Sequence, residues 1–204
     1  MRFGLKPSAV YVNPTERCNL NCSYCYIPED LRKNGQHMSA DDLFYTLDKL
    51  KAYFGEFMPK ERRPQIVFHG AEPLLNREAV FPAIEKFGED FSFGIQTNGT
   101  MLDDEAVAFL TQHEVGIGLS IDAASAETGD KTRTTWDGSS VHDTVLQAMH
   151  KLRNYSKYNV ICTVTQENMD QIVDIVDFFH EQEVPACLLN MVRCTLPGAR
   201  DYKP

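Results

Sequence analysis

The stretch Cys18-Asn19-Leu20-Asn21-Cys22-Ser23-Tyr24-Cys25 carries three cysteines at a C-x3-C-x2-C spacing. It comes shortly after the apolar run Ala9-Val10-Tyr11-Val12, which predicts a buried strand. Three thiolates on one short loop can hold three irons of a [4Fe-4S] cluster, and the fourth iron then lacks a protein ligand. By analogy with zinc sites, an open position on a metal centre indicates a catalytic rather than a structural role.

The same cysteines allow two other interpretations. Structural zinc prefers four ligands at spacings such as two C-x2-C pairs. His37 is the nearest further candidate ligand, and it completes no familiar zinc pattern. A disulfide is unfavourable in a reducing compartment. Spacing alone therefore leaves zinc open as the alternative to the cluster.

The composition is that of an ordinary globular protein, because 43% of the 204 residues are apolar and 24% are charged. This length suits one domain with a sizeable core. The net charge of −9 and the lack of a basic stripe argue against a nucleic-acid partner. No apolar run is long enough for a membrane span or a signal peptide. We therefore expect a cytoplasmic protein with no membrane partner.

Three further cysteines lie outside the motif. Cys162 and Cys187 fall in apolar, strand-like runs and are predicted to be small buried side chains. Cys194 comes after the last of these runs, and the pattern makes no prediction for it.

Strand-like apolar runs alternate with helical patterns along the chain. Six strands are predicted, at Ala9–Val12, Gln65–Phe68, Phe91–Gln96, Val115–Ile121, Val160–Val164 and Ala186–Val192. Five helices lie between them, with caps expected at Ser39, Asn76, Asp103 and Asn168 and a helix end at Gly55. This alternation predicts parallel strands joined by right-handed crossovers. The pattern alone does not separate an open sheet from a partial barrel.

In such folds, sites form at the carboxyl ends of the strands. After the second strand comes His69-Gly70-Ala71-Glu72-Pro73, where the small residues let backbone approach a ligand. After the third comes Gln96-Thr97-Asn98-Gly99, and after the fourth Ser120-Ile121-Asp122, in which Ser120 and Asp122 share one side of the strand. A polar segment over residues 123–140 follows, and its length indicates a functional loop.

Together these segments resemble the motifs of radical S-adenosylmethionine (SAM) enzymes. The cysteine loop matches the signature C-x3-C-x-aromatic-C, with Tyr24 as the aromatic residue. The G-A-E-P sequence at 70–73 is similar to the family's G-G-E-P, with Ala71 replacing the second glycine. Residues 96–99 are similar to the Q-T-N-G stretch of the peptide- and protein-modifying branch, especially the anaerobic sulfatase-maturating group. Residues 120–124 are similar to S-L-D-G-P, with Ala123 and Ala124 replacing Gly-Pro. The resemblance implies an α/β fold, a partial (β/α)6 TIM-like barrel with parallel strands.

The resemblance also implies roles for individual residues. Cys18, Cys22 and Cys25 would bind the [4Fe-4S] cluster, and Gln96 and Asp122 are candidate catalytic residues near the substrate. The implied SAM-binding residues are Tyr24, Gly70, Ala71, Glu72, Pro73, Asn98, Ser120, Asp122, Arg133 and Met191.

By this resemblance the chain is an enzyme that reductively cleaves SAM at the cluster to a 5′-deoxyadenosyl radical, which abstracts hydrogen from a peptide or protein substrate. A low-potential donor of the flavodoxin or ferredoxin type would supply the electron. Two alternatives stay open, a radical SAM enzyme acting on a small molecule and a non-enzymatic iron–sulfur electron-transfer module. Residues 1–204 are expected to form a single radical SAM core domain, the N-terminal part of a longer protein.

Overall fold

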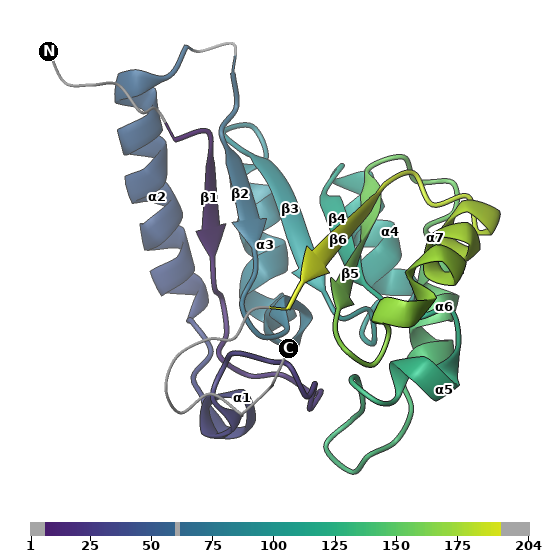
Figure 1. Ribbon diagram of the computed structural model, residues 1–204. Helices are drawn as coiled ribbons and strands as arrows, with labels where there is room; N and C mark the ends of the chain where they lie inside the picture. Colours follow the sequence, from purple (N-terminus) through teal and green to yellow (C-terminus); the bar gives the residue numbers. More distant parts are fainter. Residues whose placement is uncertain (1–6, 60–61, 193–204) are drawn as a thin grey trace, which may run out of the picture.

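The computed structural model describes residues 7–59 and 62–192. Six strands form one sheet in the order β1-β2-β3-β4-β5-β6, and every neighbouring pair is parallel. Figure 1 shows that the sheet is curled and that α2, α3, α4, α6 and α7 lie along its outer side. The predicted parallel α/β architecture is therefore confirmed, and the sheet is a half-barrel rather than a flat open sheet.

The six predicted strands and five predicted helices are present, with strand ends shifted by at most two residues, and two short helices, α1 and α5, were not predicted. The strands are β1 (Ala9–Val12), β2 (Gln65–Phe68), β3 (Ser92–Thr97), β4 (Gly116–Ser120), β5 (Tyr158–Val164) and β6 (Cys187–Met191). The helices are α1 (Glu29–Asn34), α2 (Ala40–Phe57), α3 (Arg77–Phe87), α4 (Asp104–Gln112), α5 (Ala126–Gly129), α6 (His142–Lys151) and α7 (Ile172–Glu181). Two 3-10 turns, η1 (Pro73–Asn76) and η2 (Met169–Gln171), precede α3 and α7.

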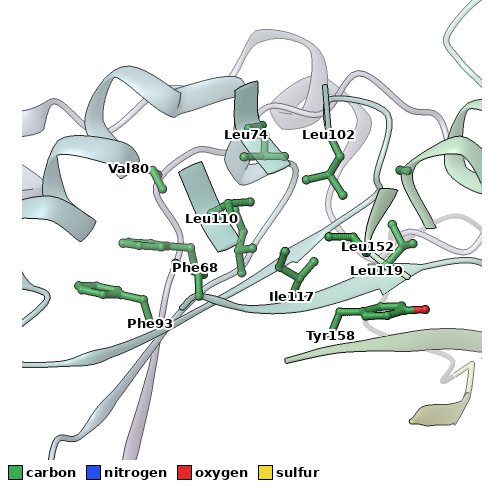
Figure 2. Packing of buried hydrophobic residues seen from close by; sticks show 14 of the residues in the cluster. Phe68, Leu74, Val80, Phe93, Leu102, Leu110, Ile117, Leu119, Leu152 and Tyr158 are labelled. Carbon is green, nitrogen blue, oxygen red and sulfur yellow. The ribbon is translucent and has the colours of Figure 1, made fainter. Parts of the chain in front are cut away.

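The core lies between the sheet and its outer helices. Phe68 of β2 stacks on Phe93 of β3 with ring centroids 5.6 Å apart, and Figure 2 shows Leu110 of α4 packed above the strands beside Ile117. Strand β5 alternates between buried and half-buried residues along its whole length. Its buried side chains join this core, so the alternate positions Ile161 and Thr163 point to the inner side of the curl.

Two predicted helix caps are confirmed. Ser39 accepts a hydrogen bond from the backbone N–H of Asp42 at the start of α2, and Asp103 accepts one from Ala106 at the start of α4. The predicted helix end at Gly55 is wrong, because α2 continues to Phe57. An added Cβ at Gly55 would meet no atom within 4 Å, so this glycine faces open space and does not interrupt the helix.

The other two predicted caps are wrong, because tertiary contacts take both side chains. Asn76 donates to the carbonyls of Pro14 and Met38, at 2.9 Å each, instead of capping α3. Asn168 donates to the carbonyls of Asp122 and Thr163 instead of capping a helix. Asn76 therefore ties the segment after β1 to the segment before α2, and Asn168 ties β5 to the segment after β4.

Of the two cysteines predicted to be buried in strands, one is buried and the other, on the edge strand β6, is exposed. Cys162 of β5 is fully buried, as predicted. Cys187 is exposed, because β6 pairs only with β5 among the described residues and all five of its residues are exposed. Cys194 lies outside the described residues. Among the helices that the structure describes, none is both long enough and apolar enough to cross a bilayer.

Leu110 offers a direct test of this core. Leu110→Ala should lower the free energy of unfolding by about 3 kcal/mol, because a fully buried leucine loses its contacts and leaves a cavity. Urea denaturation measures the change. The matched control is Glu105→Ala on the exposed face of the same helix, which should change stability by less than about 0.5 kcal/mol. Equal losses in both variants would contradict this packing.

Candidate active site

A cavity of about 390 Å³ opens at the carboxyl ends of the strands, within the size range of small-molecule sites. All three motif cysteines line it, together with residues from the ends of β3, β4, β5 and β6. Of the residues predicted from the sequence, those lining the cavity are Cys18, Cys22, Cys25, Tyr24, Gly70, Ala71, Gln96, Asn98, Ser120, Arg133 and Met191. Predicted site residues that lie as far apart in the sequence as Cys18 and Met191 are therefore brought to one place.

The cysteine loop is paired with the segment that follows β4. The backbone N–H of Asn21 donates to the carbonyl of Thr134 at 2.8 Å, and that of Ser23 donates to Thr132 at 2.9 Å. Leu20 and Thr135 form an antiparallel bridge in the same stretch. This pairing gives a structural reason for the length of the polar segment over residues 123–140, which reaches across the barrel mouth to the cysteines.

Helix α1 and Trp136 hold the other side of the loop. The indole N–H of Trp136 donates to the carbonyl of Cys18 at 2.9 Å. The buried Arg32 donates to the carbonyls of Leu20 and Ile27. Its guanidinium also lies 4.9 Å from the Trp136 ring centroid, so the two residues brace each other.

A buried polar group links Tyr24 to β4. The Tyr24 hydroxyl donates to Asp122 at 2.5 Å and accepts from Nη1 of Arg133 at 2.7 Å. Burial is the main reason that the pKa of Tyr24 is raised well above its usual range, so the phenol stays protonated and can donate. Asp122 also accepts from the backbone N–H of Thr163. Asp122 is not among the described residues lining the cavity at the strand ends. It contacts two residues that do line it, Tyr24 and Arg133.

Glu72 and Pro73 lie behind the cavity wall rather than in it. The Glu72 carboxylate is fully buried and accepts hydrogen bonds from the Leu74 N–H, the Thr97 hydroxyl and the Asn98 N–H. Burial raises the pKa of Glu72, and these donors oppose the rise. The side chain thus joins the ends of β2 and β3. Direct contact of Glu72, Pro73 or Asp122 with a cofactor stays a prediction.

Gly70 shows why this turn needs a residue without a side chain. Its φ of 110° is a conformation that residues with a Cβ rarely adopt. A Cβ at Gly70 would lie 3.0 to 3.1 Å from three atoms of the Asn13 side chain. The neighbouring Ala71 carries its methyl group at the cavity wall, at the position where the family motif has its second glycine.

Several residues of the site gave no signal in the sequence. Arg32 and Trp136 donate hydrogen bonds to backbone carbonyls of the cysteine loop, and Trp136 is 118 residues from Cys18 in the sequence. Ile161 and Thr163 line the cavity because β5 alternates, which could have been inferred once its inner face was known. A buried arginine in a short polar helix has no pattern that distinguishes it from a solvated one.

The donor set fits a cluster with one open iron. Burial is the largest cause that raises the pKa of Cys18 to about 12, and burial also raises that of Cys22. Without a metal, the thiols of Cys18 and Cys22 would stay neutral, and metal binding would release their protons. No three His, Cys, Asp or Glu side chains within residues 7–59 and 62–192 converge as a single metal ion would require. Cluster cysteines bind different irons, and Cys18, Cys22 and Cys25 line one cavity where they could each bind one iron of a [4Fe-4S] cluster.

The cavity also fits a small zwitterion beside the cysteines. Arg133 is 7% exposed, and its Nη2 atom is buried without a hydrogen-bond partner. A buried unpaired donor is costly, so an acceptor from a ligand would be stabilised there. The carboxylate of SAM is such an acceptor, and Ser120 and Asn98 line the same cavity.

A family model described as the Radical SAM superfamily matches residues 12–179 of the chain. This chain belongs to the radical SAM superfamily. The radical SAM superfamily is a family of enzymes whose cofactors are a [4Fe-4S] cluster and SAM, so the expected family, enzyme class and cofactors are confirmed. This radical SAM chain would hold the [4Fe-4S] cluster on its three cysteines and SAM in the cavity that they line.

Relatives with related sequences match between 86% and 100% of the radical SAM chain. A protein of Archaeoglobus fulgidus known only as uncharacterised is 37% identical over 203 residues, 100% of this chain and 46% of that protein. The serine-type anaerobic sulfatase-maturating enzyme of Bacteroides thetaiotaomicron is 29% identical over 86% of this chain and 44% of the enzyme. Fe-coproporphyrin III synthase of Methanosarcina barkeri is 29% identical over 92% of this chain and 44% of the enzyme. The chain thus spans about half the length of the relatives it matches.

Solved structures share the fold. Native anSMEcpe with bound AdoMet and the Cp18Cys peptide matches with a TM-score of 0.79 and 21% identity, over 97% of this chain and 55% of that chain. Streptococcus suis SuiB bound to the precursor peptide SuiA matches with a TM-score of 0.73 and 17% identity, over 92% of this chain and 40% of that chain. The expected partial (β/α)6 barrel is confirmed.

Cysteine replacement tests the cluster site. After anaerobic reconstitution, Cys22→Ala should lose most of the bound iron and sulfide, because two thiolates cannot hold three irons. Chemical iron and sulfide analysis measures the loss. The matched control is Cys187→Ala, a cysteine that is exposed on β6 and is not among the cavity-lining residues. Full iron content in Cys22→Ala would contradict the assignment.

Proposed function

We propose that this radical SAM chain takes part in abstracting a hydrogen atom from a peptide or protein substrate. Bound together at the strand ends, the cluster and SAM supply hydrogen-atom abstraction from an unactivated carbon. The chain's own residues orient these groups and exclude water from them. The observation that carries the proposal is that the three cysteines and Arg133 line one cavity at the carboxyl ends of the strands.

Two residues would position SAM, and a third would contact the substrate. Arg133 Nη2 is free to pair with its carboxylate, and the guanidinium is held in place by the Tyr24 hydroxyl. Gly70 lets the backbone after β2 come close to the ligand. Gln96 lines the cavity from β3 and is a candidate for contact with the substrate.

The peptide part of the proposal is supported by relatives rather than by a contact in this chain. A relative is named as a sulfatase-maturating enzyme, and two structures of the same fold carry peptides. The cavity extends to β6, where Met191 is 66% exposed, so its rim is accessible in the described chain. An extended peptide could approach the cysteines from that rim.

A small-molecule substrate is the second candidate, because a relative of similar identity is named Fe-coproporphyrin III synthase. An electron-transfer module is less well supported. Neither Cys162 nor Cys187 is among the described residues lining the cavity, so neither provides a fourth sulfur there. A flavodoxin- or ferredoxin-type donor, a cytoplasmic location and a single core domain over residues 1–204 stay predictions.

Arg133 tests SAM binding. Arg133→Lys keeps the positive charge but loses the second, unpaired donor, so affinity for SAM should fall roughly tenfold or more. Equilibrium dialysis with labelled SAM on the reconstituted protein measures it. The matched control is Arg153→Lys, an exposed arginine paired with Glu183, whose SAM affinity should not change. Equal affinity in Arg133→Lys and the unaltered protein would remove Arg133 from the SAM site.

Isotope transfer tests the substrate class. Reconstituted, reduced protein is incubated with SAM and deuterated peptides that contain serine or cysteine, and separately with a deuterated porphyrin-type precursor of Fe-coproporphyrin III. The proposal expects deuterium in the 5′-deoxyadenosine formed with peptide and a mass change in the peptide. Deuterium transfer only from the porphyrin would favour the second candidate, and 5′-deoxyadenosine without transfer from any substrate would contradict the peptide proposal.

A further inference from the structure

We propose that Asn98 sets the reduction potential of the cluster by donating a hydrogen bond from its side-chain amide to the sulfur of Cys18. The proposal rests on the cluster assignment and is independent of the substrate class. It gives Asn98 a role beyond its predicted contact with SAM, as a residue that acts through a cluster ligand.

The contact is direct. Nδ2 of Asn98 lies 3.8 Å from the Cys18 sulfur, which is within hydrogen-bond reach for a sulfur acceptor, and 2.9 Å from Oδ1 of Asn19. An amide nitrogen carries two hydrogens, so it can serve both acceptors at once. Asn98 is only 8% exposed, and a hydrogen bond in such surroundings is stronger than one in water.

The surrounding hydrogen bonds fix which way the amide points. Oδ1 of Asn98 accepts from the Thr100 N–H at 2.9 Å and from the Thr100 hydroxyl at 2.6 Å. The Thr100 hydroxyl in turn accepts from Nδ2 of Asn19, which closes a ring of three side chains. A flipped amide would set its NH₂ group against a backbone donor, so the observed orientation, with Nδ2 toward the sulfur, is the stable one.

The backbone of Asn98 is fixed as well. Its N–H donates to the buried Glu72 carboxylate at 2.7 Å. Gly99 follows with a φ of 82°, and a Cβ there would lie 2.5 Å from Leu119, so this turn requires glycine. Asn98 is therefore held at both its backbone and its side chain beside Cys18.

Two N–H groups then converge on one cysteine. The backbone N–H of Leu20 donates to the Cys18 sulfur at 3.4 Å, and Asn98 adds a side-chain donor. Donors to ligand sulfurs stabilise negative charge on the cluster, and the reduced state carries more of it. The Asn98 donor should therefore favour reduction and make the potential less negative.

The test is the midpoint potential of the reconstituted cluster, measured by EPR-monitored titration without SAM or substrate. Asn98→Ala should shift it to a more negative value. A tenfold change in the one-electron equilibrium corresponds to about 59 mV. The matched control is Thr100→Val, which removes a hydroxyl group from the same ring but leaves the Asn98 donor. The midpoint potential of this variant should stay near that of the unaltered protein. An unchanged potential in Asn98→Ala, or equal shifts in both variants, would overturn the proposal.

A second measurement tests the hydrogen bond even if Asn98→Ala fails to hold a cluster. Protein with asparagine labelled by ¹⁵N only at the side-chain amide is reconstituted and reduced, and pulsed EPR records nitrogen couplings. The proposal expects a ¹⁵N coupling to the cluster that is absent from unlabelled protein and is kept in Asn19→Asp, which lacks the other labelled amide of the ring. Absence of any such coupling overturns the hydrogen bond itself. Because neither measurement involves turnover, failure here leaves the peptide proposal standing.

Discussion

The site depends on the backbone pairing between the cysteine loop and residues 132–135. The cysteines arrive from β1 and the partner segment arrives from β4, so the pairing spans the mouth of the barrel. It carries Arg133 to Tyr24 and Asp122 and places Trp136 against Cys18. A single short pairing thus positions the three sulfur donors and the arginine that faces the same cavity.

Buried polar side chains complete what this pairing begins. Glu72 joins the turn after β2 to the end of β3, Asn98 joins the end of β3 to the cysteine loop, and Asp122 joins β4 to β5. Each accepts or donates several hydrogen bonds, so burial of these groups is compensated. Side-chain hydrogen bonds therefore link β2 to β3, β3 to the cysteine loop, and β4 to β5 at the cavity end of the sheet.

The sequence allowed the strands, their parallel order and the motifs at their ends to be predicted, because apolar period and local turn chemistry are short-range properties. Its failures were at residues whose partners are distant. Asn76 and Asn168 carry cap-forming side chains, and here they bond carbonyls of other elements. Cys187 has an apolar sequence context, and its exposure follows from the position of β6 at the edge. Arg32 and Trp136 were missed because only the folded chain brings them to the loop.

The central claim is that Cys18, Cys22 and Cys25 hold a cluster with one iron left for SAM. The most direct measurement is the EPR spectrum of the anaerobically reconstituted, reduced protein, recorded with and without SAM. This account predicts that SAM changes the cluster signal in the unaltered protein and changes it less in Arg133→Lys at the same SAM concentration. A cluster signal that SAM leaves unchanged in the unaltered protein would contradict the account.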